Sequence, residues 1–218
     1  MTKISQPEAS NFVAATAMFV EVLVVGIGSL TALAIFGAAA AGYRNVKDIA
    51  PIFGSTPASG AAIAFSYALG ILVDRAADSS LTSARRRLRS QHFTSNAAYD
   101  QARRAIVRLP DLVARADYAR SRMRICRGWF FNSILLIAAT DLALVRFPVQ
   151  DRLLLISLAT TIGILMASGF YAAWKSITVT GYRKLAQQSQ VSDPDSPATP
   201  GVVATNQAAG DAQPDGDR

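Results

Sequence analysis

The chain has few of the residues that build covalent scaffolds and most catalytic centres. Its 218 residues include one cysteine, Cys126, and one histidine, His92. A disulfide framework, a zinc cluster and a cysteine–histidine catalytic pair within one chain are therefore nearly excluded. We expect neither a metal nor any other cofactor.

Enzyme motifs are also missing. The sequence contains no GxSxG, Walker, HExxH or GxGD pattern. Gly26-Ile27-Gly28 lies inside an apolar stretch that no strand precedes, so it is not a nucleotide-binding loop. Intramembrane proteolysis would need two aspartates at similar depth, and only Asp141 lies within an apolar block. We predict that the protein is not an enzyme.

Apolar residues are abundant, and they are concentrated in four blocks. A helix needs about 20 mostly apolar residues to cross the roughly 30 Å hydrocarbon layer. The second block is shorter and needs help from the apolar residues 49–53, so a re-entrant path is the alternative for it. A cleaved signal peptide is disfavoured because the first block is too long and contains Glu21. The blocks are Phe12–Gly42, Ala58–Val73, Gly128–Val145 and Leu153–Trp174.

Positive charge lies between the second and third blocks. Residues 75–127 contain 13 arginines and four aspartates, a local net charge of +9. The positive-inside rule places this segment, and with it both termini, in the cytoplasm. Trp129, Trp174, Tyr171 and Tyr182 fall where aromatic anchors at the inner interface would lie. The predicted location is a bacterial inner membrane.

The arginine-rich middle is predicted to be helical. Ser95-Asn96 is typical of a helix cap, and Leu109-Pro110-Asp111 of a break followed by a new helix. The helix from Asp111 is expected to continue into the third block, and the second span to continue to Arg89. These extensions and the Ser95–Arg108 helix would form a cytoplasmic helical module.

The predicted fold is therefore an all-α membrane protein with four transmembrane helices in two hairpins. We divide it into a first hairpin (1–74), the arginine-rich module (75–127), a second hairpin (128–175) and a cytoplasmic tail (176–218). The tail is rich in Ser, Pro, Ala, Gly, Gln and Asp from about residue 189, so it is expected to be disordered.

Two ionisable side chains fall inside the apolar blocks. A carboxylate at the position of Asp141, near the middle of the third block, costs roughly 2.5–3.5 kcal/mol on insertion scales. It must face the helix interior, meet a partner or carry a proton. Two hypotheses apply to Asp141 and Glu21. They form part of an ion or proton path, or they are packing groups that form hydrogen bonds with Ser or Thr of another helix. Their expected depths differ by about 7 Å, so a paired acid site is a further alternative.

A second candidate is a stripe on one face of the second helix where it leaves the membrane. Tyr67, Gly70, Asp74 and Asp78 follow helical spacing, and Arg75 lies off their face. Gly70 would leave a gap for close backbone approach. The stripe predicts either a cation-coordinating face or, preferably, salt bridges to nearby arginines.

The arginines themselves form the third candidate site. Juxtamembrane basic clusters attract anionic lipid at about 1 kcal/mol per residue. Binding of lipid or of a protein partner competes with a purely topological role, and binding of a phosphorylated ligand or nucleic acid is less favoured. The candidate residues are Arg85, Arg86, Arg87, Arg89, Arg120, Arg122, Arg124 and Arg127.

Small side chains form two packing faces. Ser157, Thr161, Ile164 and Ser168 share one face of the fourth helix, and Gly60 with Ala64 forms a small-xxx-small pair in the second. Such faces allow close helix packing. They would indicate oligomers if they outnumber the neighbours available in one bundle.

These features favour a non-enzymatic inner-membrane protein that forms homo-oligomers. It would act as a gated pore or as a signal-responsive membrane effector through its arginine-rich helices. Expected partners are the lipid bilayer, including anionic lipids, and a cytoplasmic protein. The alternatives are a small proton-coupled transporter, which the lack of an internal repeat disfavours, and a structural membrane anchor for a cytoplasmic complex.

Overall fold

The computed structural model describes residues 6–42, 56–107 and 110–192. The predictions that concern residues 49–53, Arg108 and the tail beyond residue 192 lie outside the described residues. Within the described part the chain is entirely helical, without strands. The helices are α1 (Gln6–Ala41), α3 (Thr56–Ser90), α4 (Asn96–Val107), α5 (Pro110–Arg146) and α6 (Arg152–Ser192).

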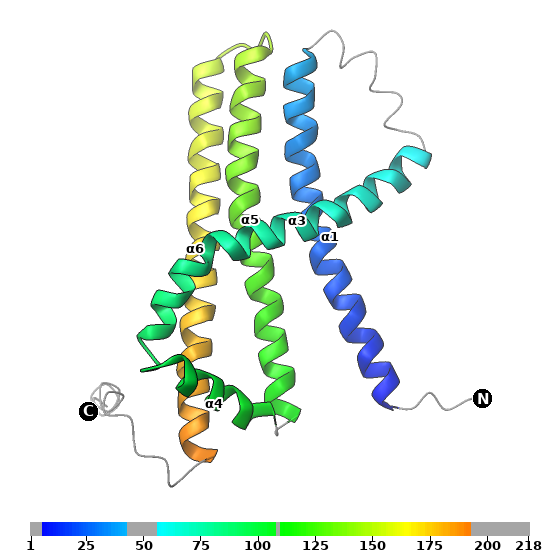
Figure 1. Cartoon of the computed structure of the whole chain (residues 1–218). Coiled ribbons are helices and arrows are strands. Elements are labelled where there is room, and N and C mark those ends of the chain that lie inside the picture. Colours follow the sequence, from blue (N-terminus) through cyan, green and yellow to red (C-terminus); the bar gives the residue numbers. More distant parts are fainter. Residues whose placement is uncertain (1–5, 43–55, 108–109, 193–218) are drawn as a thin grey trace, which may run out of the picture.

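Four of these helices are long and apolar enough to cross a membrane. The candidate spans are Ala15–Ala41, Pro57–Ser90, Tyr118–Arg146 and Arg152–Gln188. They contain the last three apolar blocks and most of the first, so the predicted all-helical fold with four long apolar helices is confirmed. The remaining helix, α4, is short. It lies at one end of the molecule, which is called the basic end below (Figure 1).

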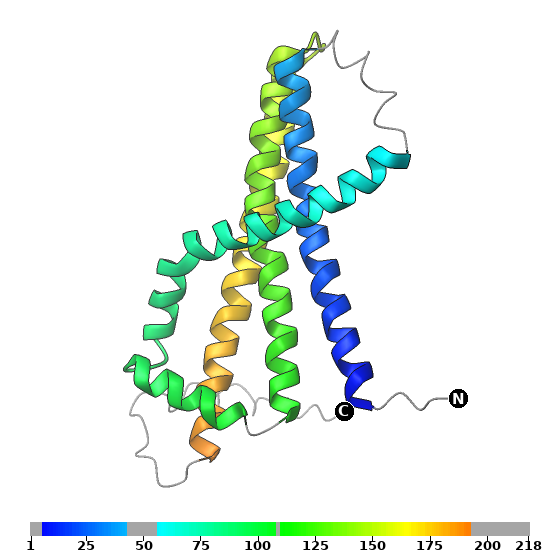
Figure 2. The same cartoon turned by 45° about the vertical axis from the view of Figure 1, so that its right-hand side comes forward.

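Three long helices form an upright bundle (Figures 1 and 2). α1 and α5 run in the same direction, because Val25 lies opposite Gly128 and Ser29 lies opposite Asn132. α5 and α6 form an antiparallel hairpin at the end away from α4. Its turn contains Asp151 with φ of 52°, a left-handed conformation that aspartate tolerates better than most residues.

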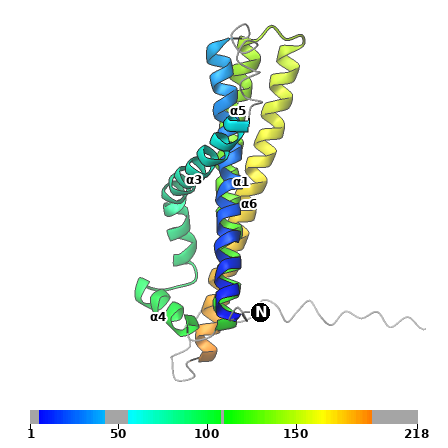
Figure 3. The ribbon, with the colours of Figure 1, turned by 90° about the vertical axis from the view of Figure 1, so that its right-hand side faces the viewer.

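The fourth long helix, α3, takes a different path from the one predicted. It does not lie alongside α1 as the second arm of a hairpin but crosses the bundle obliquely (Figures 1 and 3). At the crossing, a Cβ on Gly26 would lie 1.7 Å from the Ser66 carbonyl oxygen, and one on Gly70 would lie 2.0 Å from that of Val22. The glycines therefore let the two backbones touch at one point, and the rest of α3 diverges from α1.

The predicted helix boundaries agree well with the structure. α5 begins at Pro110 and continues without a break to Arg146, and α3 continues to Ser90. The Ser95 hydroxyl accepts a hydrogen bond from the Ala98 amide at 3.1 Å, so Ser95 caps α4. The proposed divisions at 74/75 and 127/128 fall inside continuous helices.

The last helix is longer than the sequence indicated. α6 continues past Trp174 to Ser192, at the edge of the region expected to be disordered. Its final turns contact α4. The basic end is therefore built from the extensions of three helices, α3, α5 and α6, together with α4.

Small side chains fill the interior, and large apolar ones lie on the outside. Ala32, Ala39, Ala77 and Ala139 are at most 1 % exposed. Many Leu, Ile, Phe and Met side chains of the candidate spans are exposed. A soluble bundle buries its large apolar residues, so this arrangement suits helices surrounded by lipid or by other copies of the chain.

Candidate functional site

The aspartate in the third apolar block bridges two helices. Asp141 on α5 accepts a hydrogen bond at Oδ2 from the Thr160 hydroxyl on α6, at 2.9 Å. Its other oxygen, Oδ1, is buried and has no hydrogen-bond partner among the described residues. An unsatisfied buried acceptor is costly, so this oxygen is the most conspicuous polar atom in the bundle.

The depth of Asp141 differs from the expectation. It lies five residues before the end of α5 at Arg146, which is about 7.5 Å along the helix axis. The side chain is thus close to the end of the bundle formed by the α5–α6 turn, rather than at its middle. The sequence allowed two roles for Asp141, an ion or proton path or a packing group bonded to Ser or Thr. The hydrogen bond from Thr160 is of the second kind.

The second intramembrane candidate, Glu21, lies near the middle of α1, far from Asp141 along the bundle. Its carboxylate accepts a hydrogen bond from the Ser121 hydroxyl on α5. Ser121 and Asp141 are twenty residues apart on one helix, about 30 Å. A paired acid site formed by Glu21 and Asp141 of one chain is therefore wrong. The expected difference of about 7 Å in depth was too small, because packing places Val25 beside Gly128 and so puts Glu21 well before Asp141 along α5.

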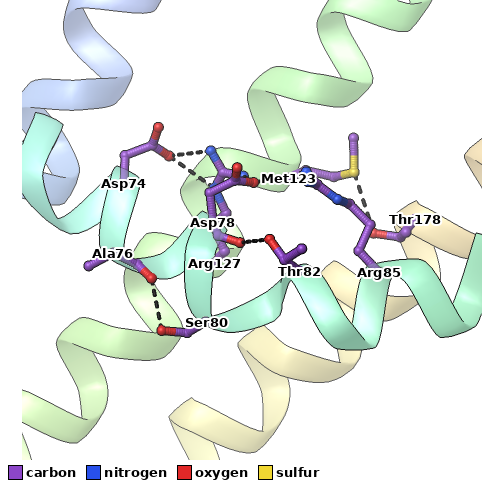
Figure 4. A network of polar contacts seen from close by, with 9 residues as sticks. All are labelled: Asp74, Ala76, Asp78, Ser80, Thr82, Arg85, Met123, Arg127 and Thr178. Carbon is purple, nitrogen blue, oxygen red and sulfur yellow. Dashed lines mark hydrogen bonds and ion pairs between the residues drawn. The ribbon is translucent and has the colours of Figure 1, made fainter.

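The predicted stripe on α3 meets an arginine of α5. Figure 4 shows Arg127 pointing at Asp74 and Asp78. Arg127 donates to Asp74 Oδ1 from Nε at 3.0 Å and from Nη2 at 2.7 Å, and to Asp78 Oδ1 from Nη1 at 2.5 Å. Asp78 Oδ1 also accepts from Arg85 at 2.9 Å. These four residues are called the α3–α5 ion-pair network.

The burial of the network makes it more than a surface contact. The Arg127 and Asp74 side chains are 14 % and 19 % exposed, whereas Asp78 and Arg85 are 34 % and 45 % exposed. Hydrogen bonds between charged groups contribute about 1.5–3 kcal/mol when partly buried, and exposed ion pairs contribute far less. The Arg127–Asp74 pair therefore dominates, and it fixes α3 to α5 one turn from the glycine crossing. The salt-bridge reading of the stripe agrees with this geometry.

The rest of the stripe lies at the α1–α3 crossing. Tyr67 stacks on Phe19 of α1, with ring centroids 5.0 Å apart. Gly70 provides the close approach to Val22 described above. The stripe is thus divided between two neighbours: its apolar half contacts α1, and its acidic half contacts α5.

The other candidate arginines are spread over two helices. Arg120 and Arg122 are exposed on α5 and Arg124 is half-buried there; the Arg122 guanidinium lies 5.7 Å from the Tyr118 ring centroid. Arg86, Arg87 and Arg89 instead line an open hollow where α3 passes into α4. The structure thus separates the arginines of α5 from a second group at the α3–α4 corner.

The sequence did not single out Asn132 or the aromatic corner. Asn132 is fully buried; its amide donates to the Val25 carbonyl at 2.7 Å, and its oxygen accepts from the Ser29 hydroxyl at 2.7 Å. Gly28 makes room for it. A buried Asn in an apolar block was a usable signal, because an amide there needs partners from another helix.

The aromatic corner joins α4 to α6. Phe93, Tyr99 and Tyr182 contact each other edge to face, with ring centroids 5.3–6.3 Å apart. Trp174 is buried at 3 % exposure, so its predicted role as an interface anchor is wrong: it packs inside the bundle instead.

The described residues contain no candidate metal site, and the comparisons with known proteins found no match. Among the described residues, no three His, Cys, Asp or Glu side chains are grouped so that they could hold a metal ion. No family model, curated protein or solved structure matches the chain.

Proposed function

We propose that the protein is a non-enzymatic, multi-pass protein of a bacterial inner membrane, with its basic end and both termini in the cytoplasm. It forms homo-oligomers and acts as a signal-responsive membrane effector. A signal received by the arginine-rich helices changes how α3 packs against the α1–α5–α6 bundle. The orientation is supported by the net charge of +9 on residues 75–127.

The observation that carries this proposal is the way in which α3 is held. Only 11 % of the most apolar part of its candidate span is buried, and Ile63, Phe65 and Leu72 are more than half exposed. The helix is attached at the glycine crossing and by the α3–α5 ion-pair network. A helix that crosses its neighbours obliquely and has one strong polar attachment is suited to two arrangements, because loss of that attachment removes much of what fixes its angle.

In its sharpest form this effector is a gated pore. Homo-oligomers would surround a path that the α3 helices close, and Asp141 and Glu21 would provide acids near its two ends. Asp141 Oδ1 would contribute an acceptor to this path, since no described residue donates to it. Exposure of the small-residue face of α6 and of Gly60 supports oligomers, because one bundle leaves these faces without a neighbouring helix.

Ion flux through liposomes that contain the purified protein tests this function. Arg127→Gln removes the arginine of the network and is expected to raise flux severalfold above wild type. Arg75→Gln removes the same charge from an exposed position beside Asp74 and should leave flux unchanged. Asp141→Asn in the Arg127→Gln background should lower the raised flux. Equal flux in wild type and Arg127→Gln, with both folded, contradicts the gated pore.

A structural membrane anchor is the second candidate. It is favoured by the Asp141–Thr160 and Glu21–Ser121 bonds, because both acids then serve packing between helices. An anchor predicts that Asp141→Asn changes the thermal midpoint and leaves flux at its background value in every variant.

A further inference from the structure

The corner where α3 passes into α4 contains a hollow of about 760 Å³ that is open to solvent. Its charged lining comes from Arg86, Arg87 and Arg89, and its hydroxyl groups come from Ser90, Thr94 and Ser95. Among the residues that the structure describes, no aspartate or glutamate lines it. We call it the corner hollow. Its volume lies within the roughly 300–1,000 Å³ range of small-molecule sites.

The arginines of the hollow have no acidic partner among the described residues. Arg86 and Arg87 are exposed, and in the part of the chain that the structure describes neither forms an ion pair. Their neighbour Arg85 is the one that pairs with Asp78. Three guanidinium groups within four residues repel one another, so their mutual repulsion falls when an anion binds among them.

One of the three arginines is held in place. Arg89 donates from Nη2 to the Asn96 side-chain oxygen at 2.7 Å, and its Cζ lies 5.1 Å from the Tyr99 ring centroid. A guanidinium fixed in this way keeps its remaining donors oriented at little entropic cost. Planar guanidinium groups bind phosphate through two parallel hydrogen bonds, which makes arginine the preferred residue for such ligands.

The base of the hollow is aromatic and joins it to α6. Phe93 lines the hollow, is 9 % exposed and contacts both Tyr99 and Tyr182. Because Tyr182 belongs to α6, these contacts hold the corner against a helix that α3 itself scarcely touches. The corner is therefore also held by α6, which lies outside the lining of the hollow.

We propose that the corner hollow binds an anion that carries at least two phosphate charges, through Arg86, Arg87 and Arg89. This anion is the signal of the proposed effector, so its regulatory role rests on the proposed function, whereas its binding does not. The chemistry is shared by a soluble organic phosphate and by the headgroup of an anionic lipid.

Pyrophosphate is the probe. Its binding to the full chain in phosphatidylcholine nanodiscs is measured by titration calorimetry. The double variant Arg86→Gln/Arg87→Gln is expected to bind at least about tenfold more weakly, since it loses two guanidinium contacts. Arg75→Gln/Lys175→Gln removes the same charge from exposed positions outside the hollow and should bind like wild type. Absence of binding to wild type, or equal weakening in both variants, overturns the site.

A second arm distinguishes the two sources of phosphate. The full chain is released from nanodiscs of phosphatidylcholine and phosphatidylglycerol, and the lipid it retains is measured by native mass spectrometry. Phosphatidylglycerol retained by wild type and lost from Arg86→Gln/Arg87→Gln supports a lipid headgroup in the hollow. Equal retention, with pyrophosphate binding still lost from the variant, supports a soluble phosphate.

The binding and flux measurements test the corner hollow and the proposed function separately. If pyrophosphate does not bind but Arg127→Gln still raises flux, the corner hollow is wrong and the proposed function stands. If pyrophosphate binds as described and no variant changes flux, the site stands and the gated pore is wrong.

Discussion

At the scale of single residues, short polar side chains connect the upright helices. Asn132 bonds to Val25 and Ser29 across the α1–α5 contact, and Thr160 bonds to Asp141 across the α5–α6 contact. Each bond has one partner on each helix, so it fixes the relative level of the two helices as well as their distance. Apolar packing alone fixes levels weakly, because neighbouring small residues are nearly interchangeable.

Asn132→Ala is expected to lower the free energy of unfolding by about 1–3 kcal/mol, because the Ser29 hydroxyl loses its bond to the other helix in a buried site. Thermal unfolding in detergent, followed by circular dichroism, measures the change. Ser133→Ala is the matched control: Ser133 is also buried, but its hydroxyl bonds to the Trp129 carbonyl of its own helix at 2.7 Å. Equal effects of the two substitutions would contradict the role given to Asn132.

At the scale of helices, local signals predicted the boundaries and missed the packing. Pro110 begins α5 and Ser95 caps α4, because proline geometry and a short hydroxyl act within one turn of the chain. The continuity of α3 and α5 followed from the absence of breakers. The salt-bridge reading of Asp74 and Asp78 followed from the surplus of nearby arginines.

The oblique path of α3 could not be predicted in the same way. It depends on contacts between residues that are distant in sequence. Gly26 packs against the α3 backbone, Gly70 packs against the α1 backbone, and Asp74 pairs with Arg127. The level of Glu21 was missed for the same reason: the first residue of an apolar block does not determine which turn of α5 lies beside it. Asn132 was visible in the sequence, but its partners were not.

Gly70→Ala is expected to disrupt the α1–α3 crossing, because the added Cβ would lie 2.0 Å from the Val22 carbonyl oxygen and neither backbone can yield without moving its helix. The thermal midpoint in detergent should fall. Gly37→Ala lies on α1, the other helix of the crossing, with nothing within 4 Å of its added Cβ. It should leave the midpoint unchanged or raise it, since alanine favours helix over glycine by up to about 1 kcal/mol. A similar midpoint for both variants would refute the crossing.

At the scale of the whole molecule, much of the apolar surface is left uncovered. Only 6 % of the most apolar part of α6 is buried. Lipid covers such a surface as well as protein does, so large apolar residues there need no partner. The small residues of the exposed α6 face are different, since they allow a second helix to approach closely.

Thr161→Phe is expected to reduce the number of chains in each detergent-solubilised particle, because a large ring on the small-residue face prevents close helix approach. Ile162→Phe places the same ring on an exposed position of the neighbouring face and should have no effect. Analytical ultracentrifugation in density-matched detergent gives the number of chains. One chain per particle in the wild type would contradict the proposed homo-oligomer.

The central claim is that the α3–α5 ion-pair network sets the angle of α3. The most direct test is the distance between spin labels on exposed Ile63 of α3 and Leu158 of α6, in a Cys126→Ser background, measured by pulsed electron resonance in nanodiscs. The account predicts one narrow distance distribution for this background and for Arg75→Gln, and a shifted or much broader one for Arg127→Gln. The same narrow distribution in all three would contradict it.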